Sequence, residues 1–201
     1  MRRKKECETT IESMNFIAEH IEKFASKLDK SSVTSLVNGI TGARKIFLMG
    51  AGRSGLAARA FAMRLMHMGF DVYVVGETTT PAVQPEDLVI AVSGSGETPS
   101  IASLGAIAKK IGSKLATITS NKDSTLGKIS DIVVVVPGRP KEDIDYEDYH
   151  ERRMIGYTQL APLGTIFEIT ALVFLDAVVS ELMVKTGASE EDLKLRHTRF
   201  E

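Results

Sequence analysis

Cysteine is nearly absent from this sequence: Cys7 is the single one in 201 residues, and there is no tryptophan. One thiol cannot close an intramolecular disulfide, and it cannot supply the thiolates of a structural zinc site. The four histidines are scattered and show no metal-ligand spacing. We therefore expect no metal site, and a protein of the reducing cytoplasm.

An excess of charge of one sign is also lacking. Lysine and arginine number 25 against 26 acidic residues, so the formal net charge is -1, and no overall field favours nucleic acid or a membrane surface. No apolar segment reaches the roughly 20 residues that span a bilayer, and the basic residues 2–5 are not followed by the apolar core of a signal peptide. We expect a small-molecule ligand, with neither nucleic acid nor a membrane as partner.

The spacing of apolar residues changes along the chain. Helical spacing over residues 8–30 predicts an amphipathic N-terminal helix, and a second short helix is expected between a cap at Ser31 or Ser32 and Gly42. Five short and continuous apolar runs follow, which are typical of strands covered on both faces, as in a parallel sheet. These runs are Lys45–Met49, Val72–Val75, Leu88–Val92, Leu115–Thr119 and Ile132–Val136.

Helix-like segments separate these runs, at residues 54–68 and 99–111 and, more briefly, within 121–128. The alternation of strand and helix is the signature of βαβ units. No repeat or linker divides the sequence, so we expect one α/β domain over residues 1–201.

The last quarter of the chain differs in composition. Residues 139–153 are rich in charge and predict a solvated loop, which a substrate or a neighbouring subunit could order. An apolar helix is expected to open at Pro162 and to run to about Lys185, where Gly187 stops it. A polar tail, residues 188–201, ends the chain.

The first glycine turn, Gly50–Gly55, directly follows the first predicted strand and opens a helix. It has the pattern G-x-G-x-x-G of a dinucleotide-binding fingerprint, and Glu77 has the spacing of an acid that holds a ribose hydroxyl. A nicotinamide-dependent oxidoreductase is therefore one alternative. The side chain of Arg53 could reach a phosphate or pair with a surface acid.

The second glycine turn follows the third predicted strand and consists of Ser93, Gly94, Ser95, Gly96, Glu97 and Thr98. The glycines let the backbone approach an anion, and the hydroxyls stand among the free amides of a helix N-terminus. Neutral donors favour a small phosphate monoester, because the Gly-Lys-Ser/Thr ending of a nucleotide P-loop is absent. An ordinary turn capped by Thr98 is the alternative, and Glu97 could bind the sugar or cap its helix.

Turns after neighbouring parallel strands converge at one edge of a sheet. We therefore expect Ser54, in the first glycine turn, to share a ligand with the second glycine turn.

The two glycine turns and the run Pro-Leu-Gly-Thr-Ile-Phe-Glu at 162–168 resemble a sugar isomerase (SIS) domain over nearly the whole chain. The run and the Arg196-His197 tail are similar to the 6-phospho-3-hexuloisomerase subfamily. The resemblance implies a three-layer α/β/α sandwich with a five-stranded parallel sheet and a cytoplasmic homotetramer with sites near subunit interfaces. It also implies interconversion of D-arabino-3-hexulose 6-phosphate and D-fructose 6-phosphate in the ribulose monophosphate pathway, without a cofactor.

Glu168 is the candidate base, because one carboxylate can remove a proton α to a ketone and return it to the next carbon. Its apolar neighbours include Ile166, Phe167 and Ile169. An unpaired carboxylate among them is costly and is expected to take up a proton readily. The alternative is a surface glutamate on the wet side of the helix; the place of Glu168 in the run at 162–168 favours the base.

His197 is the candidate for moving protons between the oxygens of the enediol, since imidazole exchanges protons near neutral pH. The resemblance implies that it reaches a neighbour's site, although Arg199 and Phe200 depart from the usual ending. A lone tail histidine would otherwise be solvated. His20 and His67 are expected to be structural.

Two further alternatives stay open. A non-catalytic phosphosugar sensor normally needs a fused helix-turn-helix segment, and the predicted N-terminal arm is a single long helix. Arabinose 5-phosphate isomerases usually carry regulatory modules in addition to the SIS domain.

Overall fold

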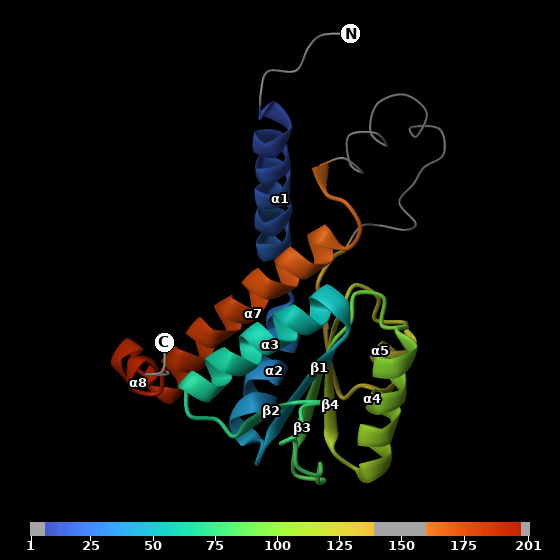
Figure 1. Cartoon of the computed structure of the whole chain (residues 1–201), viewed down its shortest axis with the longest axis vertical. Helices are drawn as coiled ribbons and strands as arrows, with labels where there is room; N and C mark the ends of the chain where they lie inside the picture. Colours follow the sequence, from blue (N-terminus) through green and yellow to red (C-terminus); the bar gives the residue numbers. More distant parts are fainter. Residues whose placement is uncertain (1–6, 139–159, 198–201) are drawn as a thin grey trace.

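The computed structural model describes residues 7–138 and 160–197, and its centre is one five-stranded parallel sheet (Figure 1). The strand order is β2-β1-β3-β4-β5, and every neighbouring pair is parallel. The strands are β1 (Ile46–Gly50), β2 (Val72–Val74), β3 (Leu88–Val92), β4 (Lys114–Thr119) and β5 (Ile132–Val135). The predicted parallel sheet is confirmed, with each strand end within one residue of that expected.

The central strands β1 and β3 are apolar throughout because each serves two cores. Along β1, Ile46 and Leu48 enter the core on one face of the sheet, while Phe47 and Met49 enter the core on the other. Successive side chains of a strand point to opposite faces. A strand with helices on both faces therefore shows a continuous apolar run instead of an alternating one.

Helices cover both faces of the sheet (Figure 1). The helices α2 (Lys30–Gly42), α3 (Gly52–His67) and α7 (Thr165–Thr186) contribute to one core. The helices α4 (Pro99–Ile111) and α5 (Thr125–Ile129) contribute to the other, and the short α8 (Glu190–Leu195) packs against α3. The expected three-layer α/β/α sandwich is confirmed.

Two helix starts differ from those expected. The cap of α2 is Asp29, not Ser31 or Ser32: its carboxylate accepts from the amides of Ser31 at 3.0 Å and Ser32 at 3.2 Å, and hydrogen bonds from Ser31 and Ser32 lower the pKa of Asp29. The helix α7 begins at Thr165 and not at Pro162, because the cap Gly164 has φ 76°, a left-handed conformation that interrupts a helix.

The end of the chain shows one feature that the sequence predicted and one that it did not. Gly187 ends α7, with φ 72° and its amide 2.9 Å from the Met183 carbonyl. The tail was expected to be merely polar, but it contains α8. Its capping box, in which Ser189 and Asp192 exchange side-chain and backbone hydrogen bonds, was present in the sequence as Ser-Glu-Glu-Asp.

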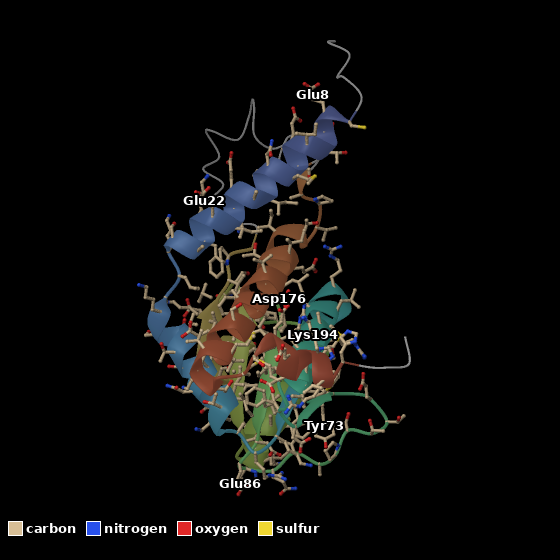
Figure 2. The ribbon with its side chains drawn as sticks, turned by 90° about the vertical axis from the view of Figure 1, so that its left-hand side faces the viewer. Glu8, Glu22, Tyr73, Glu86, Asp176 and Lys194 are labelled. Atoms are coloured by element: carbon tan, nitrogen blue, oxygen red, sulfur yellow. The ribbon has the colours of Figure 1, made fainter. Side chains whose placement is uncertain are left out.

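The N-terminal helix α1 (Glu8–Ser26) extends away from the sandwich (Figures 1 and 2) and has no buried residue. Its inner end packs on α7, where the Phe24 and Phe174 rings meet edge to face with centroids 6.0 Å apart. Nε2 of His20 lies 3.3 Å from the Pro137 carbonyl oxygen, a structural contact. Among the helices of the described ranges, none has the length and apolar character to cross a membrane.

Candidate functional site

The two glycine turns lie together at the carboxyl ends of the strands. The first follows β1 and leads into α3, and the second follows β3 and leads into α4. Since β1 and β3 are hydrogen-bonded neighbours in parallel, the N-termini of α3 and α4 open at the same edge of the sheet. This crevice is where open parallel sheets bind ligands, and helix N-termini there attract anions.

The first glycine turn is built around a close approach of strand and helix. A Cβ on Gly55 would lie 2.7 Å from the Gly50 carbonyl oxygen, so only glycine fits at position 55. Gly52 has φ 56°, which also favours glycine. Ser54, with an exposed fraction of 9%, lies within this turn, in the first turn of α3.

The second glycine turn offers backbone donors. In the part of the chain that the structure describes, the amides of Gly94, Ser95 and Thr98 donate to no protein acceptor, whereas those of Ser93 and Gly96 are bonded at 3.0 Å each. The Ser93 and Thr98 hydroxyl oxygens lie 3.4 Å apart. The side chain of Thr98 caps no amide of α4, so capping by this side chain is not seen. A ligand at this turn stays a prediction.

The second glycine turn is held in place by residues that sequence reasoning missed. The Gly94 carbonyl accepts from the Ser120 amide at 2.9 Å and from the Ser120 hydroxyl at 2.7 Å. Gly96 has φ 65°, and a Cβ there would lie 2.0 Å from Ser124 Oγ. Ser120 and Ser124 follow β4, so small polar residues occur after β4 as they do after β1 and β3. This recurrence could have indicated that the loop after β4 belongs to the same site.

The Glu97 side chain caps helix α5, and not α4, which is the helix that follows Glu97 in the chain. Its carboxylate accepts from the Thr125 amide at 2.8 Å and from the Thr125 hydroxyl at 2.7 Å, at the first residue of α5. The side-chain and backbone hydrogen bonds from Thr125 lower the pKa of Glu97. Of the two roles left open, the structure shows the capping role, which ties α5 to the second glycine turn.

Phe167, the residue before Glu168, packs against the second glycine turn. The Phe167 side chain, 4% exposed, fills the space over Gly94, where a Cβ would lie 2.9 Å from its Cδ1 atom. The Glu168 carboxylate folds back over the start of α7, against Gly164, where a Cβ would lie 2.8 Å from Oε1. The side chain is 16% exposed, so the alternative of a glutamate on the wet side of the helix is wrong.

Glu168 is not unpaired. Arg53 Nε, in the first turn of α3, donates to Glu168 Oε2. The expectation of an unpaired carboxylate is therefore wrong, because the sequence separation of 115 residues concealed the cation that faces it. Of the two partners left open for Arg53, the structure shows an acid, and that acid is the candidate base.

His197 lies far from Glu168 in the same chain. Its ring stands beside that of His67, with centroids 5.1 Å apart, at the C-terminal end of α3. Arg53 is at the opposite end of that helix, about 20 Å away at 1.5 Å per residue. Figure 1 shows α8, which precedes His197, at the far end of α7 from the start of that helix, where Glu168 stands.

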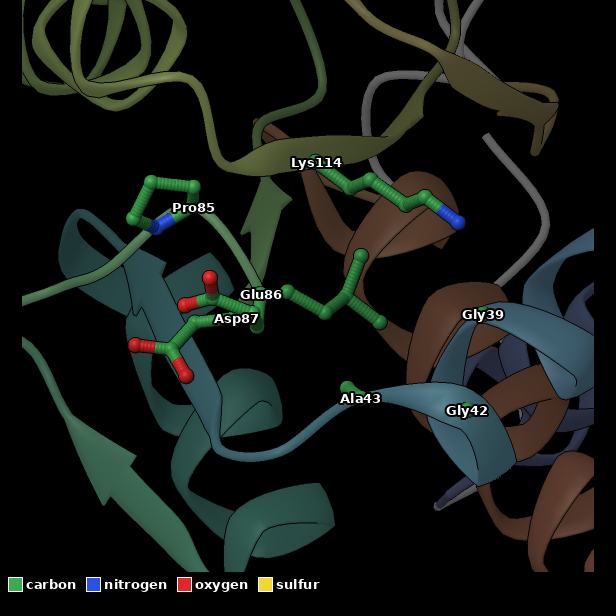
Figure 3. A pocket seen from close by; sticks show the side chains of 8 residues that line it. Gly39, Gly42, Ala43, Pro85, Glu86, Asp87 and Lys114 are labelled. Carbon is green, nitrogen blue, oxygen red and sulfur yellow. The ribbon is translucent and has the colours of Figure 1, made fainter.

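A small hollow of about 180 Å³ lies at the opposite, amino ends of the strands (Figure 3). Figure 2 marks this end of the molecule by Glu86. The lining of this hollow includes Pro85, Asp87 and Lys114. The hollow is smaller than the roughly 300 Å³ of ordinary ligand pockets. The buried Asp87 carboxylate accepts hydrogen bonds from Arg44 Nη2 at 3.0 Å and from the Gln84 amide at 2.7 Å. These contacts give Asp87 a structural role at this end of the sheet.

Several expectations lie outside the described residues. These are the charged loop 139–153 with His150, and the tail beyond His197 that holds Arg199 and Phe200. In the described ranges, no group of three or more His, Cys, Asp or Glu side chains could hold a metal ion.

Comparison with known families decides between the alternatives that the glycine turns left open. Residues 39–146 match the model of the SIS domain. The chain belongs to the SIS domain family. The G-x-G-x-x-G pattern of the first glycine turn is therefore part of a SIS domain, and the nicotinamide-dependent alternative is wrong.

Curated relatives of this SIS domain extend over most of the chain. A 3-hexulose-6-phosphate isomerase of Bacillus subtilis is 38% identical over 96% of this chain and 99% of its own length. One of Mycobacterium gastri is 36% identical over 94% of this chain and 90% of its own. A Methanococcus jannaschii structure, described as inferring a 3-hexulose-6-phosphate isomerase function, superimposes with TM-score 0.78 at 34% identity, covering 94% and 99% of the two chains.

Proposed function

We propose that this SIS domain is a phosphosugar isomerase that interconverts D-arabino-3-hexulose 6-phosphate and D-fructose 6-phosphate through an enediol, in the ribulose monophosphate pathway. The observation that carries the proposal is the contact of Phe167 with Gly94. Glu168 follows Phe167 in α7, and its carboxylate pairs with Arg53 in the first glycine turn, which supports a position near the free donors of the second glycine turn. A phosphate anchor and a proton acceptor then belong to one site, and relatives named for this reaction cover most of the chain.

The phosphate is held by neutral donors. The amides of Gly94, Ser95 and Thr98 and the hydroxyls of Ser54, Ser93, Ser95 and Thr98 can surround its oxygens. The N-termini of α3 and α4 add their positive ends. Binding energy at this anchor orients the far end of the sugar, where the reaction takes place.

The proton moves between adjacent carbons. Glu168 accepts the proton from carbon 2 of the 3-hexulose, which leaves an enediol across carbons 2 and 3, and returns a proton to carbon 3 to give the 2-ketose. One hydroxyl proton must also move from the oxygen on carbon 2 to the oxygen on carbon 3. His197 of a second copy is the proposed carrier, because the same chain holds its own His197 about 20 Å from Arg53 along α3.

This arrangement assumes an assembly. A cytoplasmic homotetramer, in which sites lie near subunit interfaces, would bring one tail to a neighbour's crevice. The exposed apolar side chains Leu56, Met63 and Met66 of α3 are consistent with a subunit contact.

A coupled assay tests the function directly. The protein is supplied with 3-hexulose 6-phosphate, and fructose 6-phosphate is detected as it forms. Sustained turnover is expected. Binding of fructose 6-phosphate without turnover would instead support the phosphosugar sensor, and turnover of arabinose 5-phosphate in place of the hexulose would support the arabinose 5-phosphate isomerase.

A further inference from the structure

The ion pair between Arg53 and Glu168 joins two groups that the reaction needs apart. Arg53 stands at the second residue of α3, inside the first glycine turn, and Glu168 stands in the first turn of α7. A carboxylate oxygen that accepts an N–H bond from a guanidinium has one of its lone-pair positions occupied. While Arg53 holds Oε2, fewer lone-pair positions of Glu168 can therefore meet a carbon-bound proton.

The two partners differ in their freedom to move. The Arg53 side chain is 56% exposed, and the Glu168 side chain is 16% exposed. The Glu168 carboxylate lies against Gly164, whose Cβ position is within 3.2 Å of both carboxylate oxygens. An exchange of partners therefore moves the more exposed arginine more readily than the glutamate.

A phosphate in the crevice is a competing partner for Arg53. The guanidinium has five donors in a planar fork, which matches two phosphate oxygens, and a phosphate dianion attracts it more strongly than one carboxylate does. The backbone of Arg53 lies directly before Ser54, so its side chain starts at the proposed phosphate site. A partly exposed ion pair is weak, which keeps the exchange accessible.

We propose that Arg53 couples phosphate binding to the release of the base. Without phosphate, the guanidinium occupies Glu168 Oε2; with phosphate, it transfers to the phosphate oxygens and leaves Glu168 free to accept the proton. Arg53 is thus a positioning residue that keeps the carboxylate occupied until a phosphorylated ligand has entered. This inference rests on the proposed function, since it takes Glu168 as the base and the glycine turns as the phosphate anchor.

The test follows the side-chain Nε–Hε signal of Arg53 by nuclear magnetic resonance during titration with inorganic phosphate. The signal is assigned with Arg53→Lys, and the titration is carried out on the full chain and on Glu168→Gln. Without phosphate, the two proteins should differ in the Arg53 signal, because the acceptor at position 168 differs. At saturating phosphate, the two signals should coincide, because both guanidiniums then bind phosphate.

Each outcome separates the coupling from the function on which it rests. If phosphate shifts the amides of Ser95 and Thr98 while the Arg53 signal stays in place, the anchor is supported and the coupling is overturned. If phosphate shifts neither, the anchor itself fails, and the proposed function loses its main support along with the coupling.

Kinetics of Arg53 variants provide the second readout. Arg53→Gln should reduce kcat/KM for fructose 6-phosphate about tenfold to a hundredfold, the range for one hydrogen bond to a charged group, and Arg53→Lys should recover part of the loss. The matched control is Arg59→Gln, on the same helix, where Arg59 pairs with Glu77 at 2.6 Å and should be dispensable. Unchanged kcat/KM in Arg53→Gln would overturn the coupling.

Discussion

Replacing Gly94 by alanine should disturb both stability and the candidate base through a single contact. The new Cβ would lie 2.9 Å from Phe167 Cδ1, closer than real Cβ contacts allow, and 3.1 Å from Cγ. The ring cannot easily give way, because Phe167 is 4% exposed and its own Cβ lies 3.4 Å from the Cβ position of Gly138. Alanine is compatible with the backbone of Gly94, since φ there is not positive, so the cost is purely steric.

The magnitude follows from overpacking. Forcing one extra methyl group into a packed site costs about 1–3 kcal/mol, and we expect this loss in the free energy of unfolding, measured by urea denaturation. Because Phe167 precedes Glu168, relief of the clash shifts the start of α7, and displacing a reacting group by about 1 Å can reduce the rate about a hundredfold. Turnover should therefore fall in the same variant.

Two further variants test this reasoning. Phe167→Leu in the Gly94→Ala background should recover part of the stability, because the smaller side chain leaves room for the methyl group, and a double-mutant cycle measures the coupling. The matched control is Gly42→Ala in α2, where nothing lies within 4 Å of the Cβ position. A Gly94→Ala protein as stable and as active as the original chain would refute the argument.

Other expectations follow from the second glycine turn. Thr98→Ala should raise KM about twofold to tenfold, the value of one neutral hydrogen bond, and should change stability by less than about 0.5 kcal/mol, because this side chain caps no amide of α4; a loss of 1 kcal/mol or more in denaturation would show that it has a structural role. Glu97→Gln should reduce sensitivity to acid. The Thr125 hydrogen bonds hold the pKa of Glu97 below 4.5 in the folded protein, so its ionised form adds stability above that value, and this stability is lost as pH falls from 4.5 through the folded pKa. A urea midpoint with the same pH dependence in both proteins would contradict this assignment.

The parallel sheet could be predicted because its signals are local. Each strand is a short apolar run, and the close approach within the first glycine turn is also local, because Gly55 meets the Gly50 carbonyl. The choice of Glu168 as the base came from the resemblance of the run at 162–168 to the SIS domain, and it stays a prediction. For the sheet, the sequence pattern and its physical cause lie within a few residues of each other.

The partners of the site residues could not be predicted, because they depend on tertiary contacts. Arg53 and Glu168 meet across 115 residues of chain, and Glu97 and Thr125 meet across 28. Nothing in the sequence near Glu168 indicates which cation faces it. The need for glycine at position 94 could not be predicted either, because Phe167, which occupies the space, comes from the distant helix α7.

The central claim is that Glu168 moves the proton, and exchange of the carbon 3 proton of fructose 6-phosphate with deuterium from solvent tests it most directly. The original protein should exchange this proton, while Glu168→Gln should exchange it about 100- to 10,000-fold more slowly, the usual contribution of a general base. Affinity for fructose 6-phosphate should change little, since the phosphate donors remain. Exchange by Glu168→Gln at the rate of the original protein would contradict the account.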